Sequence, residues 1–107
     1  MKRKRNLGSP AIEHAKEAKI TAEQAGSAAR LAIRNLTFKP IDCAAAEKQL
    51  RGMEWYAGSS LHAQDSASEH RDHLDPEHDW PAAWERTTAD MLKARELFES
   101  RCRIIPR

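Results

Sequence analysis

Residues 10–38 read PAIEHAKEAKITAEQAGSAARLAIRNLTF and form the longest periodic stretch of the chain. Small apolar residues recur here at alternating steps of three and four, which places them on one side of an α-helix. This alanine stripe consists of Ala11, Ala15, Ala18, Ala22, Ala25, Ala29, Ala32 and Leu36. Methyl side chains bury little area each, so such a helix needs a second backbone close by to add dispersion contacts. The stretch therefore predicts a close-packing helix.

The bulk composition favours a single all-α domain. The chain has 107 residues, of which 40% are hydrophobic, 32% charged and only 6% aromatic, and valine is absent. This length suits one domain, and the scarcity of strand-forming residues argues against a sheet. We expect residues 1–9 to be a flexible basic arm and residues 10–107 to be a single helical domain.

Start and stop signals define the first two helices. The Ser-Pro pair at 9–10 begins the first helix, and the Lys-Pro pair at 39–40 ends it. Asp42 is predicted to cap a second helix that ends between Ala57 and Leu61, where a glycine and two serines favour fraying. Because the connection is so short, we expect these helices to form an antiparallel hairpin.

A third helix is predicted at the C-terminal end. Residues 62–79 are polar, acidic and rich in histidine, and we expect them to form a connection. Asp75-Pro76-Glu77 and Asp79-Trp80-Pro81 are both cap-and-proline signals for a last helix that runs to about Cys102. This helix carries most of the large apolar side chains. The predicted fold is a three-helix bundle in which the last helix packs across the hairpin.

The two cysteines and the hydropathy of the chain bear on its location in the cell. Cys43 and Cys102 are too few for the disulfide framework of a secreted mini-protein, and no metal-binding spacing links them. Reduced thiols in a cytoplasm fit best, although a single bridge is compatible with the sequence. No apolar signal-peptide core or membrane-spanning run is visible. We therefore expect a cytoplasmic protein that makes no contact with membranes.

Two features of the sequence predict protein binding. Gly26 costs about 1 kcal/mol relative to alanine inside a helix, and close backbone contact along the small residues around it would compensate. Trp55 and Tyr56 form an adjacent aromatic pair, which suits either a binding hot spot or the edge of a core. The predicted interface, for a second copy or a larger protein, comprises Ala18, Ala22, Ala25, Gly26, Ala29, Trp55 and Tyr56.

Basic residues support an alternative, nucleic-acid accessory function through phosphate contacts. The candidates are Lys2, Arg3, Lys4, Arg5, Arg30, Arg34 and Lys39. The arm and the other three cations lie at opposite ends of a helix about 40 Å long, so a monomer does not bring them together. An antiparallel dimer of first helices would do so, which makes nucleic-acid binding conditional on self-association.

The histidine-rich segment supports a second alternative. If it is helical, His70 and His73 share one face, where Glu69 or Asp72 could complete a zinc-type site. The HExxH pattern of zinc proteases is absent. The same histidines would also suit a pH response, or a hydrated loop without a specific role.

No segment carries the signature of an enzyme. The sequence lacks GxSxG, CxxC and Walker motifs. We therefore predict a non-enzymatic interaction protein, without cofactor or small-molecule substrate, whose partner is a second copy or another protein. Nucleic-acid binding and metal or pH sensing are the alternatives.

Overall fold

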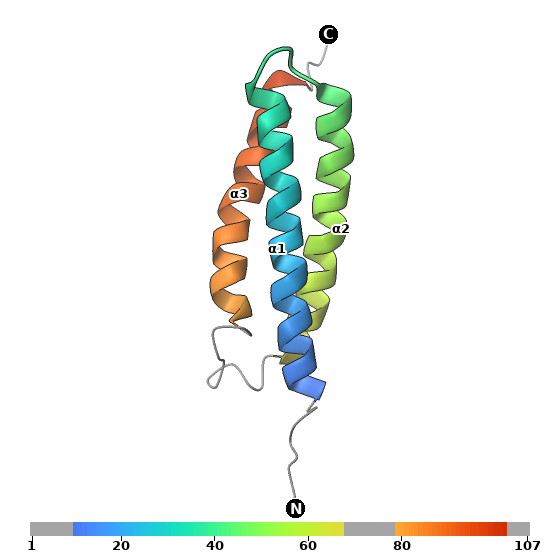
Figure 1. Cartoon of the computed structure of the whole chain (residues 1–107), viewed down its shortest axis with the longest axis vertical. Helices are drawn as coiled ribbons and strands as arrows, with labels where there is room; N and C mark the ends of the chain where they lie inside the picture. Colours follow the sequence, from blue (N-terminus) through green and yellow to red (C-terminus); the bar gives the residue numbers. More distant parts are fainter. Residues whose placement is uncertain (1–9, 68–78, 103–107) are drawn as a thin grey trace, which may run out of the picture.

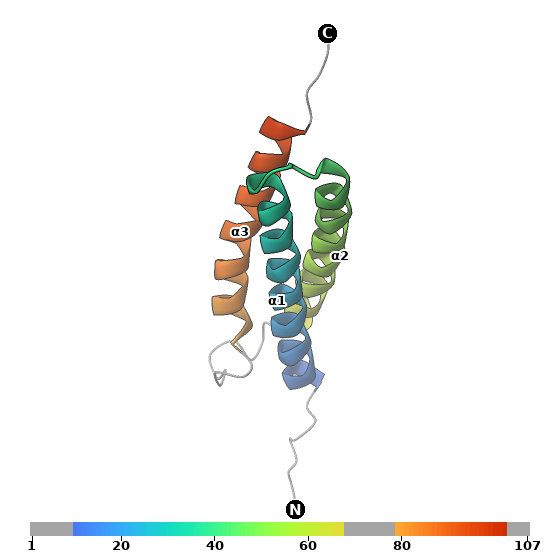
Figure 2. The ribbon, with the colours of Figure 1, turned by 45° about the horizontal axis from the view of Figure 1, so that its top comes forward.

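The computed structural model describes residues 10–67 and 79–102 and contains three α-helices within them. Helix α1 spans Pro10–Thr37, α2 spans Cys43–Ala67 and α3 spans Trp80–Arg101. Helices α1 and α3 run in the same direction and α2 runs opposite to both (Figure 1). A second view shows the same side-by-side order, with α1 between its two neighbours (Figure 2). The predicted all-α three-helix bundle is confirmed.

The helix starts follow the capping chemistry of the sequence. The Asp42 carboxylate accepts a hydrogen bond from the backbone N–H of Ala45 at 2.9 Å, at the start of α2. The Asp79 carboxylate accepts one from the N–H of Ala82 at 3.1 Å, and a proline follows in the first turn of α3. Each aspartate thus satisfies an N–H group that has no partner inside the helix. The predicted cap at Asp42 is confirmed. Of the two predicted starts of the last helix, the structure shows the one at Asp79, and Asp75 lies outside the described residues.

Helix α2 is longer than the sequence predicted. It continues through the glycine and two serines at 58–60 and ends at Ala67, so the expected stop between 57 and 61 is wrong. Leu61, one of the predicted ends of this helix, is 49% exposed. The inner face continues instead through Ala63 and Ala67, which pack with Trp80 and the first turns of α1. Burial of this extra length offsets the weak local helix propensity.

The alanine stripe forms the centre of the bundle. Its described members, from Ala15 to Leu36, are at most 1% exposed. Helix α1 packs against both α2 and α3, whereas α2 and α3 contact one another only sparsely. Bulk is supplied from the flanking helices, with Met53 of α2 and Met91 of α3 in the main core cluster. The stripe is therefore the surface on which the other two helices assemble.

Two hydroxyl groups show how closely the helices approach. Ser60 Oγ of α2 donates a hydrogen bond to the carbonyl oxygen of Ala18 at 2.8 Å. Thr87 Oγ1 of α3 donates one to the carbonyl oxygen of Ala22, also at 2.8 Å. Such short side chains reach the backbone of α1 only where no larger side chain separates the helices. The predicted close packing is confirmed, and its partners are the other helices of the same chain.

Gly26 lies at the tightest point of the contact with α3. A Cβ atom added there would lie 2.9 Å from Thr87 Oγ1 and 3.2 Å from a terminal nitrogen of Arg30. The arginine end can move away, but Thr87 is buried and held by its bond to Ala22. The glycine is thus required by the approach of α3, as the sequence suggested.

The end of the bundle where α1 connects to α2 is held by a disulfide and a hydrogen bond. Cys43 at the start of α2 and Cys102 after α3 form a disulfide, so the predicted reduced thiols are wrong. Arg101 donates to the carbonyl oxygen of Leu36 at 3.0 Å, which satisfies an acceptor at the end of α1. The sequence could not reveal the bond, because the two cysteines lie 59 residues apart.

The location of the protein stays a prediction. Disulfides are typical of oxidising compartments rather than a reducing cytoplasm. Among the described helices, none has an apolar stretch of the length that crossing a membrane requires.

We expect Gly26→Ala to lower the free energy of unfolding by about 1 kcal/mol, because overpacking against Thr87 exceeds the gain in helix propensity. In a Thr87→Ala background the same substitution should raise the free energy of unfolding by up to about 1 kcal/mol. Gly52→Ala and Gly58→Ala are matched controls that should also stabilise, since nothing lies within 4 Å of their added Cβ atoms. Urea unfolding measures each variant. A stabilising Gly26→Ala in the wild-type background would contradict the close approach.

Reduction of the Cys43–Cys102 bond should lower the free energy of unfolding by about 4 kcal/mol, the loop-entropy value for a separation of 59 residues. Urea unfolding with and without reductant measures the difference. The double variant Cys43→Ser/Cys102→Ser should match the reduced protein and show no response to reductant. Two thiols that react readily in the untreated folded protein would argue against the bond.

Candidate interaction surface

The alanine stripe is already occupied within the chain. Ala18, Ala22, Ala25 and Ala29 are each 0% exposed, and Gly26 is buried. Their neighbours are α2 and α3, as the hydroxyl bonds to the α1 backbone show. In the folded bundle these five residues therefore face α2 and α3, and their contact with a partner protein stays a prediction. An interface has to use other side chains.

The opposite side of α1 carries larger side chains that face solvent. Ile20 is 54% exposed, Leu31 47% and Phe38 66%. The Phe38 N–H bonds to the carbonyl oxygen of Arg34, so Phe38 continues the last turn of α1. Exposed residues alternate here at steps of four and three, as on one side of a helix. We call this line the outer stripe; it consists of Ile20, Gln24, Ser27, Leu31, Arg34 and Phe38.

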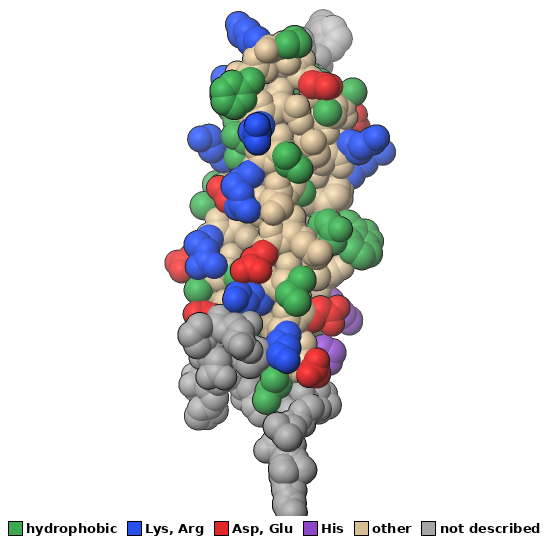
Figure 3. All heavy atoms as spheres, viewed as in Figure 1, with side chains coloured by type: hydrophobic (Ala, Val, Ile, Leu, Met, Phe, Trp, Pro, Cys, Tyr) green, Lys and Arg blue, Asp and Glu red, His purple; other side chains and the backbone are tan. Residues whose placement is uncertain are grey.

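The outer stripe contains a shallow, mostly apolar hollow. It is lined by Ser27, Arg30, Leu31 and Arg34. These residues are spaced i, i+3, i+4 and i+7, which is the set that forms a hole for an incoming side chain in knobs-into-holes packing. Figure 3 shows hydrophobic side chains along the middle of this face, over α1.

The predicted aromatic pair lies on α2. The rings of Trp55 and Tyr56 are 5.2 Å apart between centroids and meet edge to face at 83°. Tyr56 is partly buried against the core, whereas Trp55 is 67% exposed. Tyr56 follows Gln49 by two helical turns, and Gln49 bonds to Asn35 of α1 at 2.8 Å. The pair therefore borders the α1 side of α2.

The predicted basic residues are brought together only in part. Arg30 pairs with Asp90 of α3 at 3.0 Å, while Arg34 and Lys39 are exposed near the end of α1. The cations of the arm, Lys2 to Arg5, lie outside the described residues. Arg86, which sequence reasoning missed, joins Arg30 in lining a cleft between α1 and α3. Most Lys and Arg side chains on the face in Figure 3 lie over these two helices.

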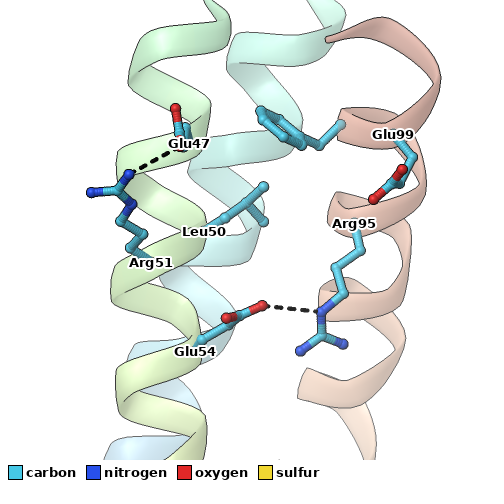
Figure 4. Close-up of a pocket in the computed structure, with 7 residues that line it drawn as sticks. Glu47, Leu50, Arg51, Glu54, Arg95 and Glu99 are labelled. Carbon is cyan, nitrogen blue, oxygen red and sulfur yellow. Dashed lines mark hydrogen bonds and ion pairs between the residues drawn. The ribbon is translucent and has the colours of Figure 1, made fainter. Parts of the chain in front are cut away.

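A second groove separates α2 from α3 and has a volume of about 210 Å³. Leu50 and Phe98 provide its apolar part, and Glu54 of α2 approaches Arg95 of α3 at 3.6 Å across it (Figure 4). Glu47 and Arg51 form a further pair on the α2 rim at 3.0 Å. An ion pair crosses this groove, and side chains of both charges line it. An apolar partner surface therefore fits it less well than the outer stripe.

The predicted metal site cannot be placed. His70 and His73 lie outside the described residues. Within residues 10–67 and 79–102, no three His, Cys, Asp or Glu side chains come close enough to hold an ion together.

The outer stripe is the feature that the sequence reasoning missed. Its signal was present, since Ile20, Leu31 and Phe38 keep helical spacing on the side opposite the alanines.

Comparison with protein-family models, curated protein sequences and solved structures finds no match to this chain.

Proposed function

We propose that this chain is a small non-enzymatic interaction protein that binds a helical protein surface through the outer stripe of α1. The observation that carries the proposal is the inverted distribution of side-chain size on α1. Methyl groups from Ala15 to Ala32 fill most of the core side, which ends in Leu36, while Ile20, Leu31 and Phe38 are 47–66% exposed on the other. Exposed apolar area costs about 25 cal/mol per Å², which a partner that covers it recovers.

The shape of the hollow supports a helix as the partner. A hole with i, i+3, i+4, i+7 spacing accepts one side chain from an adjacent helix, with the next knob about one turn away. Arg30 and Arg34 flank Leu31 and would favour a carboxylate beside the apolar knob. The partner surface that fits is an amphipathic helix with acidic and aliphatic residues on one face.

Leu31→Asp should abolish partner binding, because it places a charge in the hollow. The matched control is Leu92→Asp on α3, since Leu92 is 57% exposed and Leu31 47%. The immobilised full chain and both variants are incubated with extract of the source cells, and retained proteins are quantified by mass spectrometry. A partner should be retained equally by wild type and Leu92→Asp, and at least about tenfold less by Leu31→Asp. If no retained protein shows this dependence, the proposal is wrong.

A second candidate function, phosphate contact with nucleic acid, rests on the cations over α1 and α3. Arg30 and Arg86 line one cleft with Ser27 and Thr87, and the carboxylates of Glu23 and Asp90 also line it. Arg34 and Lys39 extend the positive charge toward the end of α1. Contacts of this kind position a backbone without reading its sequence.

If this second function holds, affinity for duplex DNA should fall steeply as salt is raised. Arg34→Ala/Lys39→Ala should reduce the slope of log K against log salt by about 2, because two phosphate contacts are lost. Lys48→Ala/Arg51→Ala on α2 is the control and should leave the slope unchanged. A slope that is the same in all three proteins would exclude these two cations from binding.

A further inference from the structure

We propose that the helix bound by the outer stripe is α1 of a second copy of this chain, packed antiparallel in a two-fold symmetric dimer. This inference rests on the proposed function, because it names the partner of the same surface.

The hollow and a side chain that fits it are both present on α1. Ser27, Arg30, Leu31 and Arg34 form the hole. Ile20 is 54% exposed and lies on the same stripe, three turns before Leu31. In an antiparallel pair, Ile20 of each copy enters the hollow of the other, and both contacts form at once. Self-complementarity of this kind is what a two-fold interface requires.

Charge along the helix selects the antiparallel orientation. The exposed acids Glu13 and Glu17 precede Ile20, whereas Arg30 and Arg34 flank Leu31. A parallel pair would place acids against acids and arginines against arginines, which is unfavourable. An antiparallel pair instead places Glu17 of each copy beside Arg34 of the other.

One register satisfies the apolar and the charged contacts together. On the exposed side of α1, Ile20 follows Glu17 by three residues, and Gln24 follows Ile20 by four. In the reverse direction, Leu31 precedes Arg34 by three residues, and Ser27 precedes Leu31 by four. Since the steps match, the pairs lie level along the two helices. The cross-contacts, each made twice, are Ile20 with Leu31, Glu17 with Arg34, and Gln24 with Ser27.

The middle of this register suits a close approach. Gln24 and Ser27 are polar and exposed, and both can exchange hydrogen bonds across the two-fold axis. Tyr56 lies on α2 between Gln49, which bonds to Asn35, and Ser60, which bonds to the carbonyl oxygen of Ala18, so it lies beside the middle of α1. Trp55 and Tyr56 therefore border the centre of the proposed dimer, on the α2 side of both copies.

Sedimentation equilibrium of the full, oxidised chain tests the dimer at about 1 µM to 1 mM, a range that spans the affinities of small interfaces. The mass should rise with concentration from 12.1 kDa to twice that value. Leu31→Asp should raise the dissociation constant at least about 100-fold, since symmetry removes two apolar contacts. Leu92→Asp should leave it within about twofold of wild type. Circular dichroism confirms that each variant is folded.

Charge reversal tests the register itself. Glu17→Arg and Arg34→Glu each create two like-charge contacts and should weaken dimerisation about tenfold. The combined variant restores opposite charges and should return the dissociation constant to within about threefold of wild type. A dimer that breaks with Leu31→Asp but shows no rescue in the combined variant would overturn the antiparallel arrangement.

The outcomes separate this inference from the proposed function. A chain that stays at 12.1 kDa throughout overturns the dimer, while Leu31-dependent retention of another protein from extract would leave the proposed function standing. A mass that rises equally in wild type and Leu31→Asp places the contact elsewhere and overturns the inference as well.

Discussion

The structure depends on direct contact between the backbone of α1 and the two helices beside it. Ser60 and Thr87, from different helices, each donate a hydrogen bond to a carbonyl oxygen of α1, one turn apart. Those carbonyls already accept bonds within α1, so the added donors use the second lone pair of each oxygen. Such contacts are possible only along a line of methyl groups. A larger side chain in place of Ala18 or Ala22 would separate the helices where these bonds form.

This constraint explains where the bulk of the protein lies. Alanines bury little area, so larger side chains from the flanking helices fill the remaining space, chiefly Met53, Trp80 and Met91. Because α1 contacts both neighbours and they barely contact each other, a groove remains between α2 and α3. On α1 itself, Leu36 fills the core beyond the last alanine, whereas Ile20 and Leu31 have no place along the alanines. They face solvent, and the candidate interaction surface follows from the packing rule.

Local chemistry made much of the fold predictable, and tertiary context decided the rest. The caps at Asp42 and Asp79 act within a few residues, so the sequence alone indicated the start of α2 and offered Asp79 as one of two candidates for the start of α3. The end of α2 was missed because burial of Ala63 and Ala67 outweighs the local signals at 58–60. Periodicity showed that the alanine stripe is buried, but periodicity carries no information on which chain buries it. The disulfide likewise depends on how α2 and α3 align, which no local pattern encodes.

The same packing argues that binding uses the outer stripe rather than a rearranged core. For a partner to reach the alanine stripe, α2 and α3 would have to leave α1, with loss of the Ser60 and Thr87 hydrogen bonds. The Cys43–Cys102 bond ties the start of α2 to the end of α3, so neither helix can leave without constraint from the other. Opening the core therefore costs nearly the whole stability of the bundle. Contact through Ile20 and Leu31 costs none of it, because both side chains are already exposed.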